Sequence, residues 1–136
     1  MKRMLIDTGP LVALIDAGDA DHDRCVAAAK QVRGDLVTTW PVITEAMYLL
    51  AHAPAGQDAL LGKVESRELS IAALSAEDIP GVRALMRKYR DQPMDFADAS
   101  LVRVAEREGI AEAFTLDRRD FSIYRLPRAR RFRIIP

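Results

Sequence analysis

The sequence predicts an α/β domain in which a parallel sheet of about five strands carries helices on both faces. Segments typical of strands alternate along the chain with segments typical of helices, the order that builds a parallel sheet. The first strand contains an apolar run from Met4 to Ile6, which ends at Asp7 and a Thr-Gly-Pro turn. Such a run, bounded by turn residues, is typical of a strand covered on both faces. At 136 residues the chain is expected to form one domain, residues 1–136.

The other elements follow from helix caps, chain breakers and apolar patterns. Further strands are expected at residues 36–39, 69–72, 113–116 and 131–135. Helices are expected at residues 11–16, about 19–32, 40–52, 57–65, 75–89 and about 94–109. Pro41 supports the start of the third helix, where a missing N–H does no harm. Ser75 is a suitable N-cap, and Gly109 closes the last of these helices.

Composition indicates a globular protein, with 49% hydrophobic and 29% charged residues. The single cysteine, Cys25, cannot form an internal disulfide, which fits a reducing compartment. No apolar stretch approaches the roughly 18 residues of a membrane span, and no signal peptide precedes the first strand. We therefore expect a cytoplasmic protein with no membrane association.

Positive charge is concentrated at the C-terminal end, although the formal net charge is zero. Residues 117–136 hold seven arginines against two acids, Asp117 and Asp120. A basic tail suggests an anionic partner, but it is also compatible with a solvated surface.

Four acidic residues are expected to meet at one edge of the sheet. Asp7 and Asp117 each end a short apolar strand, Glu45 lies one turn into the third helix, and Asp98 lies in the first turn of a later helix. The carboxyl ends of parallel strands share one edge, which is where open α/β sheets bind ligands. Each acid alone could equally be a helix cap or an ion-pair partner; Asp7, for instance, could simply cap the helix that follows it.

A divalent cation would explain the four acids together. Two unit charges ~4 Å apart repel by about 4 kcal/mol at an effective dielectric near 20. Mg²⁺ and Mn²⁺ prefer oxygen ligands and support attack on phosphate, so a metal site accounts for the cluster better than four independent caps.

The motifs resemble those of PIN domains, and more narrowly those of the ribonuclease toxins of VapBC-type toxin–antitoxin modules. The resemblance covers nearly the whole chain. The motifs that carry it are Asp7-Thr8-Gly9, Thr44-Glu45-Ala46, Asp95-Phe96-Ala97-Asp98-Ala99 and Thr115-Leu116-Asp117-Arg118-Arg119-Asp120-Phe121.

The resemblance implies a Rossmann-like fold and Mg²⁺- or Mn²⁺-dependent endoribonuclease activity. It also implies a cognate antitoxin that inserts a segment at the active site, and a homodimer. By motif position, the acidic quartet corresponds to Asp7, Glu45, Asp98 and Asp117, with Asp95 and Asp120 beside it as further candidates. Asp7 and Asp98 would be the principal metal ligands, with Asp117 completing the set directly or through water.

Other residues have roles that the sequence leaves open. Glu45 could hold a second metal or position the attacking water. Thr8 and Thr115 either hydrogen-bond carboxylates or a phosphate, or simply end strands. Arg118 and Arg119 are candidates for RNA contacts, whereas Trp40 is expected to be a packing residue.

The helix that contains both Asp95 and Asp98 separates their roles. At 100° per residue, Asp98 falls inside the apolar face of this helix and Asp95 falls on its polar side. A carboxylate on an apolar face is costly unless donors or a metal meet it, so Asp98 is the better candidate ligand and Asp95 the better N-cap.

The main alternative function is a catalytically silent module of the same fold that binds RNA or a protein. A phospho-acceptor domain is disfavoured because no lysine follows Lys88, and a nucleotide-binding enzyme because neither GxGxxG nor GxxxxGK occurs.

Overall fold

The structure, a computed structural model that describes residues 2–136, has the expected α/β architecture. Its sheet has five strands, all parallel, in the order β3-β2-β1-β4-β7. The strands of this sheet are β1 (Arg3–Ile6), β2 (Asp35–Thr38), β3 (Leu69–Ile71), β4 (Glu112–Phe114) and β7 (Arg133–Ile135). The helices are α1 (Thr8–Ile15), α2 (His22–Ala29), α3 (Trp40–Leu49), α4 (Pro54–Glu65), α5 (Ile79–Lys88), α6 (Phe96–Glu108) and α7 (Arg118–Ile123), with 3-10 turns η1 (Ala76–Asp78) and η2 (Pro127–Ala129).

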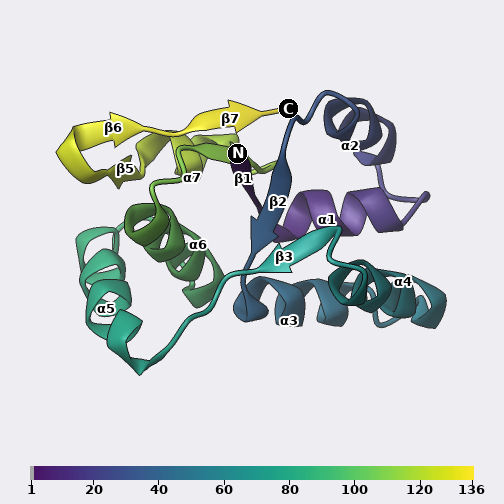
Figure 1. Cartoon of the computed structure of the whole chain (residues 1–136), viewed down its shortest axis with the longest axis horizontal. Helices are drawn as coiled ribbons and strands as arrows, with labels where there is room; N and C mark the ends of the chain where they lie inside the picture. Colours follow the sequence, from purple (N-terminus) through teal and green to yellow (C-terminus); the bar gives the residue numbers. More distant parts are fainter. Residues whose placement is uncertain (1) are drawn as a thin grey trace.

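Helices lie on both sides of the sheet, as expected. In Figure 1, α1, α2 and α4 lie on one side of the central strands, and α5 and α6 lie on the other. Helix α3 contacts both α1 and α6, so it joins the two groups of helices. The N-terminal end of α6 is thereby held next to α3.

The strand order creates a crevice at one point on the sheet edge. The chain runs outward from β1 to β2 and β3, then crosses back to place β4 and β7 on the other side of β1. Leu5 of β1 is accordingly paired with Val37 on one side and with Ala113 on the other. Ligands of open α/β sheets bind outside the strand ends where the order reverses. That point lies between the carboxyl ends of β1 and β4.

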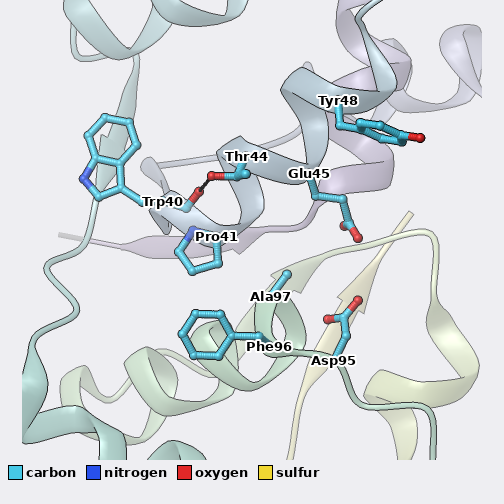
Figure 2. A pocket seen from close by; sticks show the side chains of 8 residues that line it. All are labelled: Trp40, Pro41, Thr44, Glu45, Tyr48, Asp95, Phe96 and Ala97. Carbon is cyan, nitrogen blue, oxygen red and sulfur yellow. Dashed lines mark hydrogen bonds between the residues drawn. The ribbon is translucent and has the colours of Figure 1, made fainter.

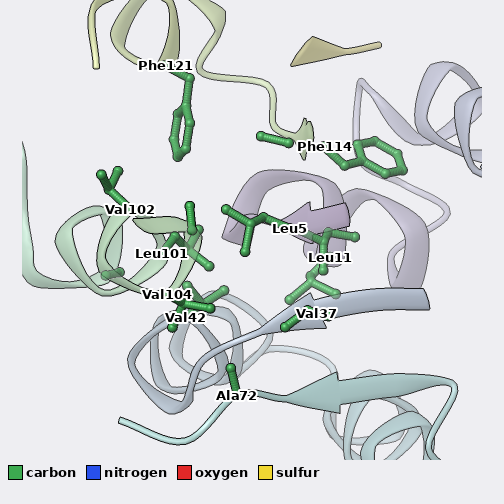
Figure 3. Close-up of a cluster of buried hydrophobic side chains, with 14 of the residues drawn as sticks. Leu5, Leu11, Val37, Val42, Ala72, Leu101, Val102, Val104, Phe114 and Phe121 are labelled. Carbon is green, nitrogen blue, oxygen red and sulfur yellow. The ribbon is translucent and has the colours of Figure 1, made fainter. Parts of the chain in front are cut away.

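A continuous apolar core fixes these strand ends. Leu5, Val37 and Phe114 of the sheet pack with Leu11 of α1 and Leu101 of α6, and all five are buried (Figure 3). Full burial of one such side chain contributes roughly 1.5–3 kcal/mol. The strand ends that border the crevice are therefore rigid supports.

Two helices begin three residues earlier than the sequence suggests, and one of them is α4, which starts at Pro54 rather than at residue 57 because a proline is tolerated in the first turn of a helix. Helix α1 starts at Thr8 rather than at residue 11, because Asp7 adopts an extended conformation and its side chain caps the helix. The strand and the helix are thus joined without a loop, and Asp7 lies at the junction.

The C-terminal region contains elements that the sequence did not reveal. Helix α7 follows Asp117, and β5 (Arg125–Leu126) pairs antiparallel with β6 (Arg130–Arg131). The last strand of the sheet consequently starts at Arg133, two residues later than expected. Edge-to-face contacts of Phe121 with Tyr124 and Phe132, at centroid distances of 5.2 and 5.6 Å, bury this region against the core. Tertiary packing, rather than local propensity, specifies it.

Among residues 2–136, no helix has the length and apolar character needed to cross a membrane.

Candidate active site

An acidic pocket of about 590 Å³ opens at the crevice between β1 and β4. All four acids expected at this edge line it, and so do the two further candidates. The pocket is lined by Asp7, Thr8, Gly9, Glu45, Leu49, Pro93, Asp95, Asp98, Leu116, Asp117 and Asp120. Segments far apart in the sequence therefore bring six carboxylates together.

Asp7 combines two roles that the sequence presented as alternatives. It caps α1 by accepting a 2.8 Å hydrogen bond from the Thr8 amide, and its carboxylate also lines the pocket. Its second oxygen accepts a 2.9 Å hydrogen bond from the Thr115 hydroxyl, which in turn accepts one from the Asp117 amide at 3.0 Å. Thr115 thus hydrogen-bonds a carboxylate, one of the two roles considered for it.

The structure separates Asp98 from Asp95 in the way that the helical periodicity indicated. Asp95 is exposed and is the N-cap of α6, accepting a 2.8 Å hydrogen bond from the Asp98 amide. Asp98 is buried, and its carboxylate accepts a 3.3 Å hydrogen bond from the Asp95 amide. Asp98 reaches the pocket from within the apolar face of α6.

The second pair, Asp117 and Asp120, is related through α7. Asp117 is exposed, is the N-cap of this helix, and accepts a 3.3 Å hydrogen bond from the Asp120 amide. Asp120 is buried and lines the same pocket. Its position could not be derived from the sequence because α7 was not expected.

Glu45 reaches the pocket from the opposite wall. It lies on α3, is half-buried, and is accessible both to the pocket and to the surface beside it. The sequence did not single out Gly9 as a lining residue. A Cβ at position 9 would lie 3.2 Å from the Leu116 side chain, so the glycine lets the two pocket walls approach closely.

Burial and mutual repulsion raise the pKa of several of these groups. Burial, together with the nearby charges of Glu45 and Asp117, raises the pKa of Asp7 from 3.8 to about 6. Burial and the charges of Asp7 and Asp95 likewise raise the pKa of Asp98. The pKa of Asp120 is raised by its own burial and by its proximity to Asp117. Negative charge in the pocket is therefore costly.

The pocket also contains polar groups without partners. Within residues 2–136, none of the six carboxylates forms an ion pair with a lysine, arginine or histidine. The Thr8 hydroxyl is buried and makes no hydrogen bond. In the described chain, no group of three acidic, histidine or cysteine residues is already arranged to hold a metal ion.

Comparison with known proteins agrees with this architecture. A family model described as "PIN domain" matches residues 4–127. The chain belongs to the PIN-domain family. It is 36% identical over 138 residues to Ribonuclease VapC26 of Mycobacterium tuberculosis (strain ATCC 25618 / H37Rv), covering 98% of this chain and 100% of that protein.

Solved structures share the fold at lower sequence identity. Mycobacterium tuberculosis VapC20, described as a sarcin–ricin loop cleaving toxin, has a TM-score of 0.76 at 22% identity, covering 84% of this chain and 91% of that chain. A toxin–antitoxin complex from Klebsiella pneumoniae has a TM-score of 0.69 at 18% identity, with coverages of 88% and 90%. VapBC2 from Rickettsia felis, bound to a DNA fragment from its promoter, has a TM-score of 0.70 at 15% identity, covering 98% of this chain and 99% of that chain.

Beside the acidic pocket, this PIN domain has an open groove of about 710 Å³. Of its eight aromatic side chains (one Trp, three Tyr and four Phe), three are exposed, and all three line this groove: Trp40, Tyr48 and Phe96. In Figure 2, the rings of Trp40, on α3, and Phe96, on α6, lie near one end of the groove, and Tyr48 of α3 lies beyond Glu45 near the other end. The expectation that Trp40 is a packing residue was wrong, since 54% of it is exposed.

The two candidate RNA-binding arginines differ in their surroundings. Arg118 donates hydrogen bonds to the carbonyl oxygens of Ile134 and Pro136, which attaches α7 to the end of the chain. Arg119 is exposed, and its guanidinium makes no hydrogen bond or ion pair with residues 2–136. Arg119 is therefore the one available to an anionic partner.

Proposed function

We propose that this PIN domain is a metal-dependent endoribonuclease and the toxin of a type II toxin–antitoxin pair. The observation that carries the proposal is the acidic pocket, in which Asp7, Asp98 and Glu45 converge at the point where the strand order reverses. The 36% identity to a protein named as a ribonuclease supports RNA as the substrate.

Mg²⁺ or Mn²⁺ fits the donor set of the pocket. Asp7, Asp98 and Asp117 would hold the ion, because hard cations prefer carboxylate oxygens and these carboxylates form no ion pair within residues 2–136. The raised pKa values of Asp7 and Asp98 support a cation at this site, because positive charge would offset the cost of ionising buried, neighbouring carboxyl groups. When bound, the ion would supply charge against the negative charge that develops on the phosphate.

The chain's own residues orient the reacting groups. The hydrogen bond from Thr115 holds the Asp7 carboxylate in one orientation, and the Thr8 amide holds its other oxygen. Glu45 has no such restraint among the described residues and faces the pocket, so its carboxylate can position the attacking water and accept its proton. Arg119 lies at the start of α7, where it can contact a phosphate of the bound RNA.

We propose that the partners are RNA, a cognate antitoxin and a second copy of the chain, and that the protein acts in the cytoplasm, where its RNA substrate is found. The antitoxin is supported by the two structural neighbours described as a toxin–antitoxin complex and as VapBC2.

The open groove lined by Trp40, Tyr48 and Phe96 is the surface that we assign to the second copy of the chain. Aromatic residues are enriched at the centre of protein–protein interfaces, and Trp40 and Phe96 are exposed near one end of the groove. Replacing both residues with serine should convert a dimer to a monomer in sedimentation velocity. Leu61→Ser is the matched control, because Leu61 is similarly exposed but lies on α4, outside the groove. An unchanged dimer in the double variant would exclude this interface.

The cleavage assay tests the function directly. Purified protein should cut RNA in the presence of Mn²⁺ or Mg²⁺, stop when a chelator is added, and resume when metal is restored. RNA binding without cleavage, in any divalent metal, would instead support the silent binding module.

A further inference from the structure

Helices α6 and α7 begin with the same arrangement of two aspartates. Asp95 and Asp117 are the N-caps, both are exposed, and each accepts a hydrogen bond from the amide three residues later, at 2.8 and 3.3 Å. Asp98 and Asp120 supply those amides, and they are only 9% and 8% exposed. All four residues line the acidic pocket.

In both pairs, therefore, one aspartate caps the helix and the other is buried at the pocket. In each pair, the outer carboxylate satisfies an amide of the first helical turn, which is the ordinary role of an N-cap. The inner carboxylate is directed into the pocket despite the cost of burying its charge. Asp120 is the third residue of α7, just as Asp98 is the third residue of α6.

Asp120 has more free ligand capacity than Asp98. One Asp98 oxygen accepts a hydrogen bond from the Asp95 amide, whereas the Asp120 carboxylate accepts none from a backbone amide of residues 2–136. Asp120 is thus a carboxylate that is nine-tenths buried on the wall of the pocket, and its side-chain neighbour there is another carboxyl group, that of Asp117. The Thr8 hydroxyl, which lines the same pocket, is buried and makes no hydrogen bond within residues 2–136. A buried polar group without a partner in a native protein indicates a ligand, a water or an ion.

We infer that Asp120 is a further metal ligand of the pocket and contributes more to metal affinity than Asp117. This inference rests on the proposed metal-dependent function. Asp117 stabilises the start of α7, and one of its carboxylate oxygens is already engaged as the acceptor of the Asp120 amide.

Titration of MnCl₂ into the metal-free protein, followed by calorimetry, tests this inference. Asp120→Asn removes the charge at nearly constant volume, and Asp117→Asn is its matched control because asparagine caps a helix about as well as aspartate. We expect Asp120→Asn to weaken Mn²⁺ binding at least tenfold, and by more than Asp117→Asn does. Asp120→Ala is a second variant in case the asparagine variant does not fold.

The outcomes separate this inference from the proposed function. If the wild-type protein binds Mn²⁺ and folded Asp120→Asn binds it equally well, the inference is wrong and the proposed function is unaffected. The same holds if Asp117→Asn causes the larger loss. If the wild-type protein binds no Mn²⁺, both the metal-dependent function and the role of Asp120 are excluded.

Discussion

The hydroxyl of Thr115 donates a 2.9 Å hydrogen bond to the carboxylate of Asp7, and so joins the ends of two neighbouring strands. The same hydroxyl accepts a hydrogen bond from the Asp117 amide. One buried side chain therefore connects β1, β4 and the start of α7. This connection sets the orientation of the pocket's central carboxylate.

Thr115→Val should impair both stability and catalysis. Valine has nearly the same shape but leaves the Asp117 amide and one Asp7 oxygen unpaired, at a cost of about 1–3 kcal/mol. Misorientation of Asp7 should lower kcat by roughly tenfold to a hundredfold. Chemical denaturation and single-turnover cleavage measure the two effects. Thr115→Ser keeps the hydroxyl and should retain most activity; equal losses in both variants would show that the methyl group matters, and not the hydrogen bond.

The metal-free protein should lose stability as the pH rises from about 4 to 7. The pKa of Asp7 is about 6 in the folded protein against an ordinary 3.8, so folding favours its protonated form. Protonated Asp7 contributes about 3 kcal/mol to the free energy of unfolding. This contribution is complete below pH 3.8 and is lost as the pH rises through 6. The raised pKa of Asp98 acts in the same direction. Urea unfolding in chelator at several pH values measures this loss.

Asp7→Asn is the control for that profile. Its Oδ1 can still accept from the Thr8 amide and its amide group can donate to Thr115, so the variant removes mainly the charge. The variant should be more stable than the wild type at pH 7 and nearly equal to it at pH 4. A constant difference between the two proteins across this range would show that Asp7 does not titrate as described.

Asp98→Ala and Asp95→Ala should have different effects. Loss of Asp98 should eliminate cleavage and weaken Mn²⁺ binding, because its carboxylate lines the pocket from the buried face of α6. Loss of Asp95 should chiefly remove the N-cap and cost about 1 kcal/mol of stability. Mn²⁺ affinity and melting temperature, measured on both variants, distinguish the two roles. The reverse pattern would mean that the exposed carboxylate is the ligand.

Arg119→Ala and Arg118→Ala should differ in their effect on RNA binding. If Arg119 contacts a phosphate, its removal should reduce the slope of log affinity against log salt by about 0.7 for single-stranded RNA. Arg118 should instead affect stability, because it holds the end of the chain. Filter binding in a cleavage-deficient background, across salt concentrations, provides the slopes. Identical slopes for wild type and Arg119→Ala would show that Arg119 is merely solvated.

The parts of the fold that the sequence predicted are those with strong local signals. The apolar run before Asp7, the proline at the start of α3 and Gly109, which ends α6 in a left-handed conformation at φ 69°, each indicate one element. The apolar periodicity of α6 even separated Asp98 from Asp95.

The parts that were missed lack such signals. Helix α7 has only six residues, and β5 and β6 are joined by a turn in which Arg128 and Ala129 have positive φ, which their residue types do not suggest. Both depend on the burial of Phe121 and Phe132, a property of the folded chain. Without α7, the sequence could not show that Asp120 is buried beside Asp117.

Cleavage of RNA by wild-type protein and by Asp7→Asn, compared side by side in Mn²⁺, tests the central claim most directly. Circular dichroism first establishes that the variant is folded. We expect the wild type to cut the RNA and the variant to be inactive, because the substitution removes one charge from the pocket and almost no volume. Undiminished cleavage by the folded variant would contradict the assignment of this pocket as the active site.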